Sequence, residues 1–407
     1  MTVPRELKIS GLSIFCLANM MFANELPLPA LPNIAAFFST TTEITQMTVA
    51  FNLAGISIFA LIHGPLSDTY GRRNILLYSL TLYLAFTLMC PFAKSIEELV
   101  FLRFLQGCSG GATTVIGLVM VNDEFSGPQT TQILSRIMLA SITASILAPI
   151  IGGHLTVDFG WQYVFFFMAG YGVFCWLLVY FYYTDMSNHP HHEGDTRAKL
   201  RTKLLNKYHQ IFEGLNEMLH HRDFLYAVTI HGSLNCGKWI YATVAPFLFI
   251  EGLGLSPVVF GYYTAAMIIA FIACSLLTEF TIKKIGNYGV IQKGLIIAAM
   301  GAGMLMTIIL FFPERPGSMA FAAALYIGGT AMLTPSGATL AMDFSKKKGA
   351  AAAVLSSSRT FMGVLGAALG GIIRQDHFIL MPIILFITIA IPAYMLFQLQ
   401  QRQKKHA

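Results

Sequence analysis

The feature that most constrains this chain is a series of apolar runs that recurs from one end of its 407 residues to the other. A helix needs roughly 20 apolar residues to cross the hydrocarbon core of a bilayer, which is about 30 Å thick. Only 11% of the residues are charged, whereas an ordinary soluble domain carries about 25%. The sequence therefore predicts an all-α membrane protein.

Charged breaks and breaks rich in glycine and proline divide these runs into twelve predicted transmembrane helices. The first six are expected at residues 11–36, 46–67, 74–93, 97–121, 133–153 and 161–184. The second six are expected at residues 224–250, 257–280, 288–312, 317–342, 349–373 and 377–398. The first run contains Glu25 and three prolines, so it is interpreted as a span and not as a signal peptide.

The lysines and arginines of the loops predict the orientation of the chain. With the N-terminus inside, eighteen of them fall in cytoplasmic segments, and only Lys94, Arg315 and Arg374 fall in outer loops. The positive-inside rule then places both termini in the cytoplasm. Membrane insertion thus explains the net charge of +6, and no nucleic-acid partner is expected.

A polar segment at residues 185–223 divides the chain into predicted six-helix bundles at 1–184 and 224–407. Within this linker, apolar residues recur at helical spacing opposite Lys203 and Lys207, which predicts an amphipathic helix on the inner leaflet.

Neither a metal site nor a disulfide framework is expected. The histidines at 188–192 have no cysteine or carboxylate partner at ligand spacing, so they are interpreted as a solvated linker. The six cysteines all lie in apolar segments and show no paired spacing. No cofactor is expected either.

The two halves carry related sequences. An acid and two bases after the second span recur at the same spacing after the eighth, 211 residues later. Gly152 and Gly153 near the end of the fifth span are echoed by Gly370 and Gly371 near the end of the eleventh. Such agreement predicts duplicated, pseudo-symmetric halves, and paired six-helix halves with a site at their interface are a transporter architecture.

The loop after the second span, residues 64–73, reads GPLSDTYGRR and resembles the signature loop of the major facilitator superfamily. Gly64 permits close helix packing and Gly71 permits a tight turn. The basic pair Arg72 and Arg73 closes the loop. This loop is quite specific for the family when it lies between the second and third spans.

The resemblance implies a charge cluster that latches the two halves together on the cytoplasmic side. Asp68 would accept hydrogen bonds at the start of the eleventh span, near Gly349. Arg72 would pair with an acid at the end of the fourth span, and either Asp123 or Glu124 fits that role.

Two further motifs extend the resemblance. In the fourth span, Arg103 begins a motif in which a membrane-embedded arginine assists proton coupling. An arginine in hydrocarbon costs at least about 2.5 kcal/mol, so Arg103 should face protein or a wet cavity, and tying helices through carbonyls is its alternative role. In the fifth span, Pro149, Gly152 and Gly153 resemble the antiporter motif of drug exporters, with Ala-Pro in place of the usual Gly-Pro.

Residues 24–32 and 245–262 are similar to segments of the Bcr/CflA-like drug-resistance branch of the drug:proton antiporters, in which Ala-Pro variants also occur. The resemblance therefore covers nearly the whole chain. It implies the major facilitator fold and a place in a bacterial inner membrane.

Ionisable residues inside the spans are the candidate functional groups. Glu25 is the only acid deep inside a span of the first half. A low-dielectric cavity disfavours an ionised carboxylate, so a proton and a cationic substrate could compete for Glu25, which is the physical basis of antiport. The alternative is that Glu25 is already hydrated near the outer end of its span.

Lys238 lies at the equivalent depth of the seventh span, near Asn235, Trp239 and Tyr241, which are candidate substrate-binding residues. Because the resemblance implies that the first and seventh spans line the cavity, Glu25 and Lys238 would either pair or bind opposite ends of a substrate. A lysine that extends to an interface is the alternative.

Arg359 in the eleventh span adds another intramembrane cation. With Arg103, Lys238 and Arg359 set against Glu25, the cavity would be positive. This charge favours an anionic or zwitterionic substrate, such as a carboxylate-bearing metabolite or a siderophore.

The leading hypothesis is a monomeric, proton-coupled antiporter for multidrug or metabolite efflux, working by alternating access. A proton-coupled importer of a small nutrient, such as an amino acid, is the second hypothesis, because the sequence does not fix direction. An integral-membrane enzyme is a distant third, since no convergent catalytic set is present. No P-loop is present, so ATP is not expected to supply the energy within this chain.

Overall fold

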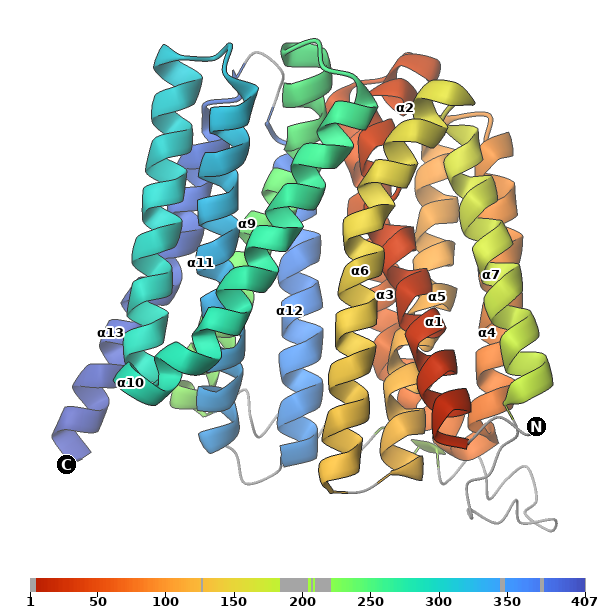
Figure 1. Ribbon diagram of the computed structural model, residues 1–407, viewed down its shortest axis with the longest axis horizontal. Helices are drawn as coiled ribbons and strands as arrows, with labels where there is room; N and C mark the ends of the chain where they lie inside the picture. The colour runs from red at the N-terminus through yellow and green to blue at the C-terminus, as the bar shows by residue number, and fades with distance from the viewer. Residues whose placement is uncertain are drawn as a thin grey trace.

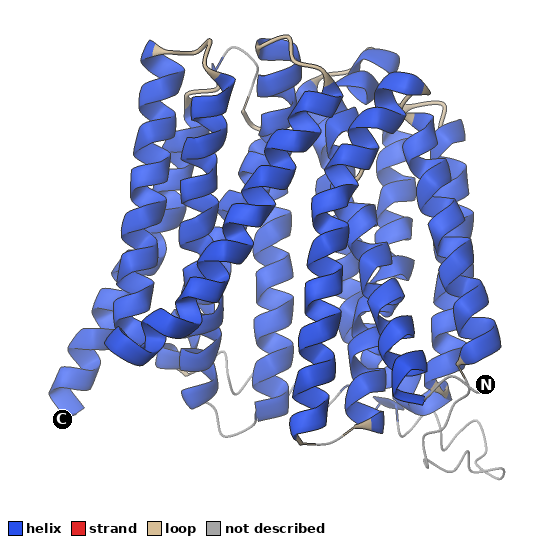
Figure 2. Cartoon of the chain, viewed as in Figure 1, coloured by secondary structure: helices blue, strands red, loops and turns tan. Residues whose placement is uncertain are grey.

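The computed structural model describes residues 5–125, 127–183, 204–205, 208, 221–344, 348–373 and 377–406. All regular structure in these residues is helical (Figure 2). The first half contains α1 (Arg5–Glu25), η1 (Leu28–Ala30), α2 (Leu31–Phe37), α3 (Thr42–Tyr70), α4 (Arg72–Met89), η2 (Cys90–Phe92), α5 (Ile96–Glu124), α6 (Pro128–Asp158) and α7 (Gln162–Tyr182). The second half contains α9 (Arg222–Pro246), η3 (Phe247–Gly252), α10 (Pro257–Phe311), α11 (Pro316–Asp343), α12 (Lys348–Gly370) and α13 (Leu380–His406).

All twelve predicted spans coincide with helical segments, although the first, at 11–36, extends over three of them, α1, η1 and α2. Two of the spans, at 257–280 and 288–312, lie in the 55-residue α10, which bends at Gly286. Gly286 has φ 68° and ψ 175°, a conformation that favours glycine, so the chain reverses direction there without a separate loop. Within the described residues, nine helical segments are long and apolar enough to cross a membrane, and α10 is long enough to cross twice.

The helices form two groups that stand side by side (Figure 1). Helices α1 to α7 occupy one side of the molecule and α9 to α13 the other, and both chain ends lie at the same end of the bundle. This end is called the terminal end below, and the opposite one the far end. An even number of crossings in each half accounts for the shared position of the termini.

Glycines bring the two halves into backbone contact at the far end. A Cβ on Gly153 of α6 would lie 2.6 Å from the carbonyl oxygen of Pro257 at the start of α10. A Cβ on Gly261 of α10 would in turn collide with the carbonyl of Pro149. On the other side of the interface, a Cβ on Gly370 of α12 would lie 2.9 Å from the side-chain oxygen of Gln46 of α3. Small residues therefore set the approach of the halves.

The predicted amphipathic helix of the linker lies mostly outside the described residues, as does the histidine cluster at 188–192. Tyr208 is described, and its hydroxyl donates a hydrogen bond to the carbonyl of Ile62 in α3, at 3.1 Å. This part of the linker therefore contacts the first half. All six cysteines are free, and the described residues contain no cluster of metal-ligating side chains.

Candidate functional site

The first helix is interrupted where it carries its acid. Pro27 has no N–H, so the carbonyl of Ala23, four residues earlier, loses its helical partner. Helix α1 accordingly ends at Glu25, and the chain continues through the short η1 into α2. Glu25 is therefore the last residue of α1 before the interruption.

Arg103 of α5 supplies the missing hydrogen bond. Its Nη2 donates to the carbonyl of Ala23 at 3.1 Å, and its Nη1 donates to Oε1 of Gln106. Gln106 continues the chain of contacts by donating to the hydroxyl of Thr87 on α4, at 2.8 Å. Arg103 is only 1% exposed and lies over the ring of Phe165. It faces protein, as expected, and it ties α1, α4 and α5 together inside the first half.

Glu25 and Lys238 form an ion pair between the two halves. Oε1 of Glu25 lies 3.5 Å from Nζ of Lys238, which belongs to α9. Glu25 is buried, at 6% exposure, while the side chain of Lys238 is 31% exposed. The Lys238 ammonium also lies over the ring of Trp239, 5.4 Å from its centroid. The sequence left open whether Glu25 and Lys238 pair with each other or bind opposite ends of a substrate. In this conformation they pair with each other.

Helix α9 has one accessible stripe. Between residues 230 and 249, only Asn235, Lys238 and Ala242 are partly exposed, and the rest are buried. Their spacing of three and four residues places them on one helix face. Trp239 and Tyr241, which were expected to contact substrate, are buried in this conformation. Their role therefore stays a prediction.

Asn24 is a candidate that the sequence interpretation did not single out. It is partly exposed, next to Glu25, and its side-chain oxygen has no hydrogen-bond partner. The internal repeat contained the signal for it, because Asn24 and Asn235 are separated by the same 211 residues that relate the loops of the two halves. Each half thus presents an asparagine beside the ion pair.

Arg359 lies on the side of α12 that packs against α9. Its side chain is exposed, and its carbonyl accepts a hydrogen bond from Nδ2 of Asn235 at 2.7 Å. The outward-facing side of α12 carries Phe361 and Leu365, which are 54% and 39% exposed. These two lie roughly 200° to 240° around the helix from Arg359, so Arg359 is turned away from that face.

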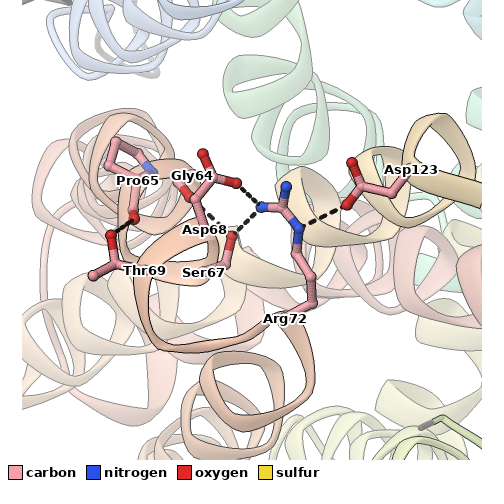
Figure 3. Close-up of polar contacts among 7 residues, drawn as sticks. All are labelled: Gly64, Pro65, Ser67, Asp68, Thr69, Arg72 and Asp123. Carbon is pink, nitrogen blue, oxygen red and sulfur yellow. Dashed lines mark hydrogen bonds and ion pairs between the residues drawn. The ribbon is translucent and has the colours of Figure 1, made fainter. Parts of the chain in front are cut away.

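The signature loop forms a compact charge cluster at the terminal end (Figure 3). Nε of Arg72 lies 2.9 Å from Oδ2 of Asp123, and Nη1 of Arg72 donates to the hydroxyl of Ser67 at 2.6 Å. Arg72 also forms an ion pair with Asp68. Asp123 is therefore the acid of the fourth span that pairs with Arg72 here. Gly71 has φ 92°, so the tight turn requires glycine.

The sequence also singled out three other residues of the signature loop, Arg73, Asp68 and Gly64. Arg73 donates to the carbonyl of Tyr180 on α7 at 2.7 Å, so it anchors the loop within its own half. The expected contact of Asp68 with the start of α12 near Gly349 adjoins residues 345–347, outside the described part of the chain. A Cβ on Gly64 would approach Val115 no closer than 4.0 Å, so close packing at Gly64 is not seen in this conformation.

The proline–glycine motif of α6 lies against both the interrupted helix and the other half. A Cβ on Gly152 would collide with the carbonyl of Leu26, the residue after Glu25. Gly153 meets the start of α10, as described above. The motif therefore connects the surroundings of Glu25 with the contact between the halves.

Two six-helix bundles, with an acid–base pair between them and a charge cluster at one end, define the class of polytopic membrane transporters. The comparisons give the family. The model of the Major Facilitator Superfamily matches residues 13–371, and the chain belongs to this family. It is a family of transporters and not of enzymes.

Individual relatives agree with this assignment. The chain is 27% identical to the "Uncharacterized MFS-type transporter YdgK" of Bacillus subtilis, over 93% of this chain and 92% of that protein. It is 24% identical to the "Bicyclomycin resistance protein homolog" of Haemophilus influenzae, over 87% of this chain and 86% of that protein. Its fold is similar to a partially occluded, inward-open structure of the xylose transporter XylE from E. coli, with a TM-score of 0.71, 13% identity, and coverage of 98% and 99%.

Proposed function

We propose that this chain is a proton-coupled secondary transporter in which the Glu25–Lys238 pair couples protonation to movement of the halves. The observation that carries the proposal is the 3.5 Å contact between a buried acid of the first half and a partly exposed base of the second. Intramembrane ionisable residues are functional candidates by default, and this pair lies at the interface where transporters of this architecture bind their substrates.

Protonation of Glu25 would remove one of the attractions between the halves. A neutral Glu25 no longer attracts the Lys238 ammonium, so the far-end contact loses stability relative to a state in which the halves separate there. Two bundles that exchange between these states expose a central site first to one side of the membrane and then to the other.

Efflux by exchange with protons is the leading form of this function. The bicyclomycin-resistance name of one relative favours export of a drug or small metabolite. A cationic substrate that needs an ionised Glu25 would compete with the proton, and competition produces exchange. The loop charges favour cytoplasmic termini in an inner membrane, and the chain would act as a monomer.

Cotransport with protons, as in a nutrient importer, is the second form. An anionic substrate does not compete with a proton for Glu25. It gains from protonation, because a negative charge disappears from its surroundings. The charge of the substrate therefore decides between exchange and cotransport.

Transport into reconstituted liposomes with an imposed pH gradient tests the proposal. The probes are ethidium, a cation, and benzoate, an anion, and every rate is taken relative to protein-free liposomes, because neutral benzoic acid crosses a bilayer unaided. In the wild-type protein, the gradient should accelerate net movement of at least one probe. Glu25→Gln should abolish this dependence while the protein still binds the probe, because glutamine cannot take up the proton.

Glu314→Gln is the matched control, since Glu314 lies in an exposed loop and, among the described residues, pairs only with its neighbour Arg315. It should transport like the wild type. If the pH gradient changed the transport rate of neither probe in the wild-type protein, the proposal would be overturned. Gradient-driven transport that persists in Glu25→Gln would remove Glu25 from the coupling role.

A further inference from the structure

The sequence singles out three intramembrane cations, Arg103, Lys238 and Arg359, and they differ in the partners of their charged groups. Arg103 donates to a backbone carbonyl inside the first half, and Lys238 pairs with Glu25. The side chain of Arg359 has no carboxylate partner among the described residues. Within the described residues, Arg359 is therefore the one of the three whose charged group has neither a carboxylate nor a carbonyl partner.

The position of Arg359 relative to Lys238 follows from one hydrogen bond. The Arg359 carbonyl is bonded to Asn235, which precedes Lys238 by three residues on the accessible stripe of α9. Three residues correspond to an axial rise of about 4.5 Å. The backbone of Arg359 thus meets the stripe about 4.5 Å closer to the terminal end than Lys238 does.

The backbone that carries Arg359 is held firmly against α9. A Cβ on Gly363 would lie 2.8 Å from Cδ1 of Trp239, and a Cβ on Gly366 would collide with the carbonyl of Cys236. These glycines lie on the same side of α12 as Arg359. Because this close helix contact fixes the backbone of Arg359, less conformational entropy is lost when its guanidinium binds a ligand.

We propose that Arg359 binds the carboxylate of an organic monoanion, and that uptake of a proton by Glu25 strengthens this binding. A guanidinium forms two parallel hydrogen bonds with a carboxylate, which suits it to this ligand. Protonation of Glu25 releases Lys238, whose ammonium can then attract the same anion. This inference rests on the proposed coupling role of Glu25 and assigns the substrate class.

The charge balance gives the sign of the coupling. Without ligand, the Glu25–Lys238 pair is neutral, and Arg359 contributes one positive charge. A site loaded with one proton and one monoanion carries the same charge as the empty site. Loading with the anion alone or the proton alone changes the charge. The balanced state favours joint binding, so the proton and the anion travel in the same direction, and this favours cotransport for such substrates.

The helices around the pair carry few other ionisable groups. Helix α7 carries no charged residue, and on α6 the ionisable residues are Arg136, His154 and Asp158, near its two ends. On α9, Nδ1 of His231 lies 2.8 Å from the carbonyl of Thr334. Because a carbonyl can only accept, Nδ1 carries the proton and the imidazole donates to it. On α5, Arg103 is committed to Ala23 and Gln106.

Binding of radiolabelled benzoate to the full-length protein in detergent tests the proposal without any transport step. The wild type should bind benzoate more tightly as the pH is lowered, and it should not bind the neutral analogue benzamide. Arg359→Gln should weaken benzoate binding at least about tenfold, whereas Arg359→Lys should keep part of it. Glu25→Gln should bind benzoate more tightly than the wild type and lose the pH dependence.

Arg136→Gln removes an exposed arginine of α6 and serves as the matched control, with binding expected to be unchanged. Gel filtration of every variant separates loss of binding from loss of folding, and the Arg359→Lys variant retains the charge if Arg359→Gln does not fold. Undiminished binding in Arg359→Gln would overturn the proposal, as would weaker binding in Glu25→Gln. The wild type could also fail to bind benzoate while the pH gradient still drives its transport of ethidium. That result would overturn the anion site and leave the proposed coupling role of Glu25 intact.

Discussion

At the scale of single residues, one missing hydrogen bond explains why Arg103 stands where it does. Pro27 leaves the carbonyl of Ala23 without its helical N–H, and a buried unpaired carbonyl is costly. The guanidinium of Arg103 compensates from α5 and remains fully inside the first half. The helix-tying alternative thus describes its contacts in this conformation, while a part in proton coupling stays a prediction.

A double-mutant cycle tests this dependence between Pro27 and Arg103. Arg103→Gln alone should lower the free energy of unfolding by about 1–3 kcal/mol, because the Ala23 carbonyl loses its donor. In a Pro27→Ala background, the alanine N–H can satisfy that carbonyl, so the same change should cost less by about 1 kcal/mol. The measurement is unfolding in mixed micelles of increasing denaturing-detergent content.

Pro246→Ala provides the control background, since Pro246 belongs to α9 of the other half. There, the cost of Arg103→Gln should equal its cost in the wild type. Equal costs in the Pro27→Ala background as well would show that Arg103 does not act through the Ala23 carbonyl.

The sequence anticipated some of these residue contacts and not others. The pairing of Glu25 with Lys238 could be anticipated because both lie at equivalent depth in related halves. The direction of Arg359 could not, since it depends on which side of α12 packs against α9, and glycines at 363 and 366 set that side only through tertiary contacts. For the same reason, Arg103 was grouped with the cavity cations although it lies inside the first half.

At the scale of helices, the crossing of α6 and α10 is built from backbone. Gly153 faces the carbonyl of Pro257, and Gly261 faces the carbonyl of Pro149, with no side chain between them. Any larger residue at either glycine would have to push the helices apart. The crossing therefore sets how closely the halves approach at the far end.

Gly153→Leu should hold the far end open. The leucine side chain would meet the start of α10, so the halves should separate there, and the population should shift toward the alternative conformation. Spin labels at Phe159 and Arg315, both exposed near the far end, report the change as a longer distance in double electron–electron resonance.

Gly170→Leu is the matched control, because a Cβ at Gly170 of α7 meets no atom within 4 Å. Its distance distribution should match that of the wild type. A wild-type distribution in Gly153→Leu would mean that the crossing does not limit the approach of the halves.

The positions of the helices were largely predictable, because a span needs a fixed length of apolar sequence in any membrane protein. Two features were not. The interruption after Glu25 lies within a single apolar run, which was predicted as one continuous span at 11–36. The two spans of α10 join through Gly286 alone, whereas the sequence suggested a loop at 281–287. Local backbone geometry determines both the interruption after Glu25 and the bend at Gly286. The hydropathy of the sequence carries no information about that geometry.

At the scale of the whole molecule, the charges at the interface determine what the protein can carry without electrical work. A load of one proton and one monoanion is neutral. A neutral load crosses the bilayer independently of membrane potential, whereas a net charge would gain or lose about 2.3 kcal/mol per 100 mV. Proton–anion cotransport at the proposed site is thus expected to be electroneutral.

Uptake of benzoate into liposomes under a potassium diffusion potential tests this expectation. With valinomycin present and the pH gradient fixed, the initial rate should be the same whether the potential is inside-negative, inside-positive or zero. A rate that follows the potential would show that the proton and the anion do not move in equal numbers.

The bend at Gly286 has a mechanical consequence. The first arm of α10 touches α6 across the interface through Gly261, while the second arm packs against α11 within its own half. Because a single residue joins the arms, there is little slack in which to absorb a rotation of the first arm. A tilt of the first arm at the far end would therefore be transmitted through Gly286 to the second arm and to α11. The second half would then move as a rigid body.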